Sequence, residues 1–489
     1  MVDKPPENRN VALALKYVLF LSFTSSLLTQ ATLSYYVHDL DPNQPSTNTK
    51  VGLVQTALGA TSLIAAIPAA AAADFIGRQA MLRAAAVVGS LTLLFFAATL
   101  FYLATFMDPP KLYLVFVLAA SAWGTFMGMH AAPLEALFGD SIETGRRSRL
   151  YVKRSALRTA GSALGPLMSI PVFAVSGDAW TRDELARVML GGVVVGIIPC
   201  SLLFFFRDDR ALGAASEGIT GTRVNQSSYI GARGRARAQM TEAIPMPQIE
   251  SDINRLALSS KNRLFLPSPS TRAIPTIIAT SDILAMLAGG MSTAFFPIFF
   301  GETLGLPPLW VQPLLVAGPL GIATTSILVQ RLTLRWGRVL VVVCTRLLGV
   351  IFLILLASTY EPVCAIPCFL LFRWFTNCTS GLNKSILNDY VSKRSRARWN
   401  ILESMNLVTW SGSALLGGYL NDHIHFRNTF RVSACVHVVS VLLVGSLYGV
   451  VHEEKEAREW KLGRVVSVDE FRGALLPESG DGGETREGE

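Results

Sequence analysis

Long apolar stretches alternate with short polar ones along most of this 489-residue chain. Twelve of the apolar stretches are long enough for a helix of about 20 residues to cross the hydrocarbon core of a bilayer. Their apolar residues run on continuously and do not alternate at every second position, which excludes a β-barrel. The pattern predicts an all-α integral membrane protein with transmembrane helices over residues 11–37, 51–73, 81–105, 112–138, 154–175, 187–206, 275–300, 308–331, 338–358, 362–387, 400–420 and 430–451.

Composition agrees with a membrane protein. Hydrophobic residues make up 51% of the chain and charged residues 16%, whereas a globular protein has about 25% charged residues. This balance excludes a soluble enzyme. The six cysteines lie inside apolar runs, so we expect them to be reduced packing residues. The first run is too long for a signal peptide and lacks a small-residue cleavage site, so we expect it to remain as the first span.

Lysine and arginine gather in alternate loops. The basic residues around 78–83, 146–154, 335–338 and 393–398 would all lie on one side of the membrane, and far fewer would lie on the other. The positive-inside rule makes the basic side cytoplasmic. With an even number of spans, both termini are then cytoplasmic as well. The formal net charge of +8 is therefore interpreted as membrane topology, and we expect no nucleic-acid partner.

The spans divide the chain into four parts. Residues 1–206 and 275–451 are each predicted to form a six-helix bundle. The segment 207–274 is rich in Gly, Ser, Pro and Arg, which is typical of a flexible linker on the cytoplasmic side. Residues 452–489 are predicted to form an acidic cytoplasmic tail.

Two short matches relate the halves of the chain. Segments 140–149 and 389–398 each begin with aspartate and end with arginine, and Gly-Ser-Ala-Leu at 161–164 recurs at 412–415. Internal repeats are common in transporter folds, so we expect two pseudo-symmetric bundles. The shared charges are candidates for gating on the cytoplasmic side: Asp140, Arg149, Asp389 and Arg398.

The loop after the second predicted helix carries a further pattern. It reads AAAADFIGRQ from position 70, and Asp74, Gly77 and Arg78 match the signature G-x-x-x-D-R-x-G-R-R of the major facilitator superfamily. Arg335 and Arg338 lie in the equivalent loop of the second half. Over residues 11–451 the chain therefore resembles this superfamily. The signature is partial, because its leading glycine and its first arginine are replaced.

The resemblance implies how these residues act. Asp74 would bind the start of the eleventh helix and close the cytoplasmic side in one conformation. Arg78, Arg335 and Arg338 are gating candidates, although the positive-inside rule alone would also explain them. The family often has a functional arginine in the fourth helix, where the repeat places Gly124. This departure puts proton coupling of the usual antiporter kind in doubt.

Arg373 is the clearest polar residue inside a predicted span. It lies about 17 Å into the tenth helix, near the membrane midplane. Asn377, Lys384 and Asn388 follow on the same helical face, which a bundle would turn inward. A charge at this depth costs about 2.5 to 3.5 kcal/mol unless it has a partner or reaches water. We expect a solute-binding or coupling site, with a structural salt bridge as the alternative.

Four further residues are weaker candidates for binding or coupling. Asp282 in the seventh helix lies too deep to be solvated, so a proton or a cation could neutralise it. Lys16 lies at similar depth in the first helix and would either pair with Asp282 or extend to the interface. Gln30 is a polar residue within the first span. Trp410 would either line a cavity for an organic solute or simply pack between helices.

The repeat also predicts two interhelical ion pairs of opposite polarity. Glu135 in the fourth helix should pair with Arg154 in the fifth, and Lys384 in the tenth should pair with Glu403 in the eleventh. The alternative is that all four side chains extend separately to the interface.

These features predict a secondary transporter that moves a small organic solute by alternating access. A coupling proton or cation is a candidate partner, beside the solute and the lipid bilayer. The chain has no G-x-x-x-x-G-K-[ST] sequence and no catalytic motif, so we expect neither ATP hydrolysis nor another enzyme activity, and no metal or cofactor. A receptor or scaffold on the same fold is the alternative function.

Overall fold

The computed structural model describes residues 8–40, 46–142, 147–212, 273–390 and 401–451. These residues form helices and no strand, and ten of the helices are long and apolar enough to cross a membrane. One of these ten helices contains both the eleventh and the twelfth crossing. The tenth crossing is formed by two shorter helices in succession. The described chain therefore makes the twelve predicted crossings, with ends shifted by a few residues.

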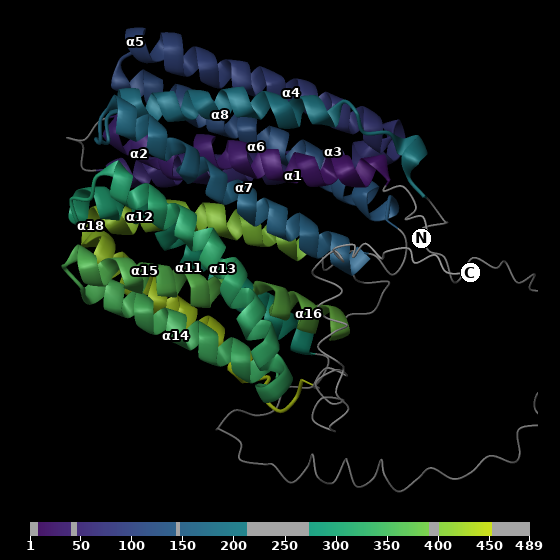
Figure 1. Cartoon of the computed structure of the whole chain (residues 1–489), viewed down its shortest axis with the longest axis vertical. Helices are drawn as coiled ribbons and strands as arrows, with labels where there is room; N and C mark the ends of the chain where they lie inside the picture. The colour runs from purple at the N-terminus through teal and green to yellow at the C-terminus, as the bar shows by residue number, and fades with distance from the viewer. Residues whose placement is uncertain (1–7, 41–45, 143–146, 213–272, 391–400, 452–489) are drawn as a thin grey trace, which may run out of the picture.

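The first half makes six crossings (Figure 1). Its helices are α1 Arg9–Leu28, α2 Ala31–Asp39, α3 Thr47–Ile76, α4 Arg78–Ala98, α5 Ala104–Phe106, α6 Pro109–Asp140, α7 Arg147–Ser176 and α8 Arg182–Leu203. A π-helical turn at Thr99–Leu103 joins α4 to α5, and a short 3-10 turn at Asp208–Arg210 follows α8.

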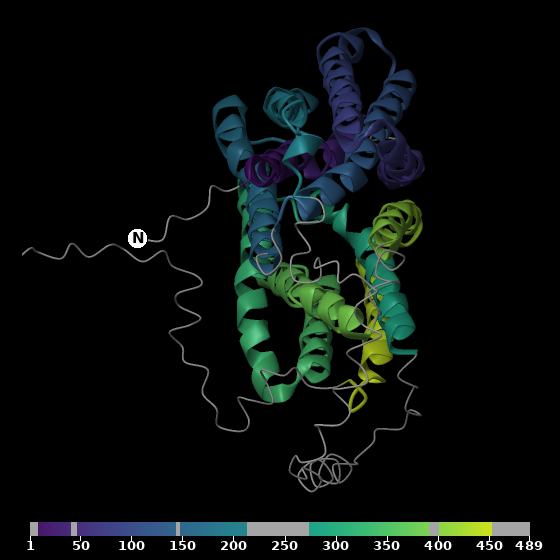
Figure 2. The ribbon, with the colours of Figure 1, turned by 90° about the vertical axis from the view of Figure 1, so that its right-hand side faces the viewer.

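The second half forms a separate group of helices below the first (Figures 1 and 2). Its helices are α11 Ile274–Thr293, α12 Phe296–Ile298, α13 Pro308–Trp336, α14 Arg338–Ser358, α15 Pro362–Asn377, α16 Ser380–Tyr390 and α18 Ile401–Gly445. A π-helical turn at Phe299–Thr303 follows α12. Helix α18 bends at His425, whose positive φ of 67° interrupts the helical backbone and separates the last two crossings.

The crossings run between two ends of the molecule. We call the end where α3 finishes and α4 begins the basic end, because the predicted basic loops lie there. We call the other end, which holds the chain between α7 and α8, the far end. The turns Gly77 and Gly337 occupy equivalent places at the basic end of the two halves. Their φ values of 91° and 83° are in a region that glycine adopts without strain.

The first crossing of each half is broken near the far end, contrary to the predicted continuous helices 11–37 and 275–300. The breaks fall at Thr29–Gln30 and Ala294–Phe295. The buried Gln55 of α3 donates a hydrogen bond to the carbonyl of Thr29 at 3.0 Å. This bond satisfies a polar backbone group that the broken helix leaves inside the bundle.

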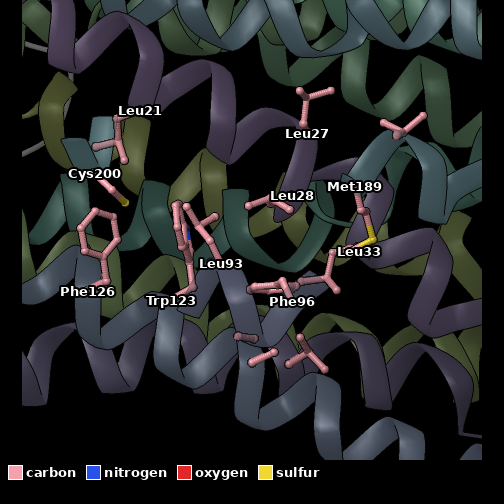
Figure 3. Packing of buried hydrophobic residues seen from close by; sticks show 14 of the residues in the cluster. Leu21, Leu27, Leu28, Leu33, Leu93, Phe96, Trp123, Phe126, Met189 and Cys200 are labelled. Carbon is pink, nitrogen blue, oxygen red and sulfur yellow. The ribbon is translucent and has the colours of Figure 1, made fainter. Parts of the chain in front are cut away.

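Apolar side chains hold each half together. In the first half, Leu28 of α1, Leu93 and Phe96 of α4, and Trp123 and Phe126 of α6 are buried in one cluster, to which α2 and α8 also contribute (Figure 3). The second half has an aromatic cluster near the far end, centred on Phe296. The ring centroid of Phe296 lies 4.8 Å from that of Phe369 and 5.0 Å from that of Phe430, which are ordinary separations for packed aromatic rings.

Glycines let helix backbones approach closely. A Cβ at Gly124 of α6 would collide with the carbonyl oxygen of Leu58 in α3. Between the halves, a Cβ at Gly52 of α3 would collide with the backbone of Ala414 in α18. Small residues at such contacts are typical of membrane helices, where close packing replaces much of the hydrophobic driving force.

The contact at Gly124 generates a prediction. Gly124→Leu should destabilise the protein by about 1–3 kcal/mol, because the added side chain must force α3 and α6 apart. The matched control is Gly191→Leu in α8, where no atom lies within 4 Å of the added Cβ. Thermal unfolding of both variants in detergent measures the difference. Equal melting temperatures for the two variants would contradict close packing at Gly124.

Candidate functional site

The residues of the partial family signature lie together at the basic end. Arg78 and Asp140 form an ion pair at 2.5 Å, which joins the start of α4 to the end of α6. Asp74 is exposed near the end of α3. Arg335 is exposed in the last turn of α13, and Arg338 is buried at the start of α14. Arg78 and Asp140, predicted from separate motifs, are therefore direct partners.

Some predicted residues cannot be placed. The residue Arg398 and the side chains of Arg149, Asp389 and Glu403 lie outside the part of the chain that the structure describes, as do most of the linker and the tail. The predicted contact of Asp74 with the start of the eleventh helix and the pairing of Lys384 with Glu403 stay predictions for this reason.

The ion pair between α6 and α7 is present in the structure. A guanidinium nitrogen of Arg154 lies against a carboxylate oxygen of Glu135. The Arg154 side chain is 19% exposed and that of Glu135 is 49% exposed. The guanidinium carbon also lies 4.9 Å from the ring centroid of Phe138, so the arginine is held by a cation–π contact as well as by its counter-charge.

Asp282 of α11 pairs with an arginine, and not with Lys16 as predicted. Its Oδ1 lies 3.3 Å from Nη2 of Arg346 in α14 and accepts a hydrogen bond from Asn383 of α16 at 2.6 Å. Arg346 is 9% exposed and Asp282 is 26% exposed. Lys16 is exposed on α1 instead. The proposed pairing of Lys16 with Asp282 is therefore wrong for this conformation, and the carboxylate is already balanced by a buried guanidinium.

The break in the tenth crossing contributes a hydrogen-bond partner to the network of side chains around Asp282 and Arg346. The sequence predicts one continuous helix over 362–387, whereas α15 ends at Asn377 and α16 starts at Ser380. Thr379, in the break, accepts a hydrogen bond from Nε of Arg346 at 3.2 Å. On the other side of the network, Ser281 and Ser440 exchange hydrogen bonds at 2.9 and 2.8 Å. Charged and polar side chains thus join four crossings of the second half.

The sequence analysis missed Arg346, although its position in an apolar run could have revealed it. Arg346 lies about 12 Å into the apolar run 338–358, so the rule that singled out Arg373 also applies to it. A search for every charge deeper than two helical turns would have found it.

Arg373 remains a candidate for binding solute. It is half-buried on α15, and within the described residues no carboxylate forms an ion pair with it. Among the described residues, Arg373 therefore forms no structural salt bridge. Asn377, one turn further on, donates a hydrogen bond back to the carbonyl of Arg373 at 2.9 Å. Asn377 thus lies beside Arg373 on the same helical face.

Neighbouring side chains define the face of α15 that carries Arg373. Trp374 donates its indole N–H to the carbonyl of Ala317 in α13 at 3.1 Å, so it faces α13. Phe369 packs on Phe296 of α12. Successive residues turn by about 100° around a helix, which places Arg373 between these two packed faces.

Two other candidates lie at a break and at a packed contact of the helices. Gln30 is exposed at the break between α1 and α2. Trp410 of α18 is half-buried, and its carbonyl lies where a side chain at Gly290 of α11 would be. Trp410 therefore sits at the packed contact between α11 and α18, which agrees with the packing alternative for this residue.

At the far end, a carboxylate of the second half caps a helix of the first. Asp422 of α18 accepts hydrogen bonds from the backbone N–H groups of Asn48 and Thr49 at 3.1 and 2.8 Å, and from their side chains at 2.9 and 2.6 Å. The first N–H groups of α3 lack partners within the helix, and its own N-cap, Ser46, makes no side-chain capping bond. Asp422 supplies the missing acceptor and also opposes the helix dipole.

The reverse arrangement occurs beside it. Asp178, which follows α7, accepts a hydrogen bond from the backbone N–H of Leu309 in α13 at 2.8 Å. The N-cap of α13 is Pro307, whose side chain has no capping group. Helices α3 and α13 are the second crossings of their halves, and the two aspartates follow the fifth and eleventh crossings. Each half therefore caps the second crossing of the other half.

Side chains around these caps complete the junction of the halves. His38 of α2 lies 3.0 Å from Glu302, which follows α12. Trp180 donates its indole N–H to the carbonyl of Leu306 at 3.0 Å, and its ring stacks on Tyr35 with 4.2 Å between centroids. No sequence motif marks these residues, because each contact joins residues more than 100 positions apart in the chain.

The buried ion pair of the second half generates a prediction. Arg346→Gln should destabilise the protein by about 3 kcal/mol, because it leaves the Asp282 carboxylate without its counter-charge. Adding Asp282→Asn should restore much of this loss. Removing the exposed pair of Arg182 and Asp39 is the control, and should cost about 1 kcal/mol or less. Chemical unfolding in detergent gives the double-mutant cycle, and equal stability of Arg346→Gln and wild type would refute the role of the pair.

Known structures share this architecture. The xylose transporter XylE from E. coli, in a partially occluded inward-open conformation, has a TM-score of 0.62 at 14% identity over 91% of this chain and 99% of XylE. A D-xylose–proton symporter has a TM-score of 0.65 at 14% identity, over 91% of this chain and 98% of its own. A bacterial homologue of the iron transporter ferroportin, in an inward-facing state, has a TM-score of 0.54 at 12% identity, over 88% of this chain and 98% of its own.

At these identities the structures establish the fold alone. No curated protein matches the sequence. The family profile described as Major Facilitator Superfamily matches residues 17–244 and 278–468, which cover most of both halves. The match agrees with the twelve crossings and with the glycine turns at equivalent places in the two halves. This multi-pass membrane protein belongs to the Major Facilitator Superfamily.

Proposed function

We propose that this protein is a secondary transporter that moves a small organic solute by alternating access between its halves. The observation that carries the proposal is the reciprocal capping at the far end, where Asp422 caps α3 and Asp178 caps α13. Hydrogen bonds at an exposed end can be exchanged for bonds to water, so this junction can open and reform.

The basic end is assigned to the cytoplasm in this proposal, in line with the positive-inside rule. The conformation described above is then closed toward the outside, because the caps and the hydrogen bond from Trp180 to the carbonyl of Leu306 join the halves at the far end. Solute would enter or leave from the cytoplasm.

Arg373 is proposed as the residue that binds solute, since its charge is half-buried and has no carboxylate partner within the described residues. Asp282 is the proposed site of ion coupling. Its carboxylate is partly exposed and held by Arg346, so a proton or a cation would compete with that guanidinium.

Solute uptake into proteoliposomes tests this function. A panel of charged and neutral solutes would be offered under proton and sodium gradients. We expect uptake of at least one solute, and at least a tenfold loss in both Arg373→Lys and Arg373→Gln, because an ammonium cannot replace the planar guanidinium. Arg83→Gln, at an exposed position of α4, is the matched control. Absence of uptake for every solute would favour a receptor or scaffold, and wild-type rates in both variants would exclude Arg373 from the site.

The caps generate a separate prediction about conformation. Asp422→Ala and Asp178→Ala should each favour opening of the far end, because a helix cap contributes about 1 kcal/mol, or about fivefold in population. The readout is the labelling rate of a thiol introduced by Ser411→Cys, at a buried position where α18 packs on α3. A membrane-impermeant maleimide added at the far end should label this thiol faster in the cap variants.

Asp108→Ala is the matched control for the caps. Asp108 lies at the same end, and its one ion pair within the described residues is with the neighbouring Lys111, on its own side of the junction. Labelling of residue 411 should therefore stay at the wild-type rate. If the cap variants label no faster than this control, the caps do not hold the far end closed.

A further inference from the structure

The charges deep inside the described helices do not balance. Apart from Asp422, which lies beside the bend of α18, two carboxylates with described side chains lie more than one turn from a helix end, Glu135 and Asp282. Each is bound to an arginine, Arg154 and Arg346 respectively. Asp282 therefore presents no free negative charge to a solute. The positive charges that remain decide which solute the interior favours.

Arg373 is the first of these positive charges. It lies about 17 Å from the far end of α15 and has no counter-charge in the described part of the chain. The face that carries it lies between the contacts of α15 with α12 and with α13. Helix α13 also packs against α7 of the first half, so this face lies next to the junction of the halves.

Arg158 of α7 is the second positive charge. It shares one helical face with Ser155 and Ser162, while Leu167 and Met168 are exposed on another face. Arg158 is exposed and forms no ion pair with a described carboxylate. It lies about 27 Å from the far end of α7, which is about 10 Å nearer the basic end than Arg373.

We infer that the transported solute is an organic anion whose oxyanion group binds the guanidinium of Arg373, and that Arg158 attracts it on the way from the basic end. This inference rests on the proposed function and names its substrate class. A guanidinium offers a planar set of donors that fits a carboxylate or a phosphate in two parallel hydrogen bonds. An anion at this site also supplies the counter-charge that Arg373 lacks inside the membrane.

The local charge can be measured without knowing the solute. Asn377→Cys places a thiol one helical turn from Arg373 on the same face. The thiol is treated with two methanethiosulfonate reagents of similar size, the anionic sulfonatoethyl and the cationic trimethylammonium-ethyl compound. Fragment-ion mass spectrometry assigns the label to residue 377 and gives both rates, so the native cysteines, including the adjacent Cys378, can stay. The ratio of the rates is corrected by the same ratio for a free thiol.

We expect the corrected ratio to favour the anionic reagent. A unit charge about 6 Å away changes each rate about threefold in a water-like environment, and therefore changes their ratio about tenfold. Adding Arg373→Gln should remove this preference, whereas Arg373→Lys should retain it, because lysine keeps the charge. Arg158→Gln should lower both the rate of the anionic reagent and the ratio by a smaller factor.

Three results would overturn the inference: a ratio that favours the cationic reagent, a ratio that Arg373→Gln leaves unchanged, or no reaction with either reagent, since an inaccessible face cannot receive a solute. Failure of the transport proposal is distinguishable from these. A protein that carries no solute into proteoliposomes would still show the anionic preference, and a protein that transports only neutral or cationic solutes would not.

Discussion

An ionised side chain inside an apolar helix needs a counter-charge, hydrogen-bond partners or water, and this requirement organises the whole protein. Glu135 and Asp282 meet it within their own halves, through arginines on neighbouring helices. At the far end, Asp178 and Asp422 bind across the halves instead, to backbone N–H groups at helix starts. Partners in the same half hold that half together, whereas partners in different halves hold the two halves to each other.

The two kinds of contact differ in how readily they can break. Arg346 is buried and bound to several side chains, so separating it from Asp282 would leave charges without solvent. The caps lie at the end of the molecule, where water can replace each lost hydrogen bond. The halves are thus internally fixed but joined reversibly. This is the division of stability that a protein with two alternating conformations requires.

The sequence predicts the crossings well because each long apolar run must satisfy its own backbone hydrogen bonds as a helix, which is a local requirement. The contact of Glu135 with Arg154 can also be expected, because both residues lie near one end of consecutive helices. The partner of Asp282 is different. Lys16 and Arg346 lie at similar depths, and only the packing of helices decides which of them is the neighbour.

The helix breaks and the contacts between the halves could not be predicted from the sequence, because they too depend on how the helices pack. No proline marks the break between α15 and α16, which instead coincides with the reach of Arg346 to Thr379. The bend of α18 lies at His425, which has a positive φ, and not at a glycine or proline that would predict a bend from the sequence. The cross-half caps join residues more than 100 positions apart. Long-range contacts of this kind leave no periodic pattern in the sequence.

The breaks at Thr29–Gln30 and Ala294–Phe295 have a mechanical consequence. A continuous helix transmits force along its length as a rod, but a helix without its hydrogen-bond ladder at one point bends there at low cost. The outer pieces of the two first crossings carry His38 and Glu302, which meet across the halves. Each break therefore lets a short outer piece follow a direction of its own, so the first crossing of a half can contact the other half at the far end while its longer inner piece stays packed within its own half.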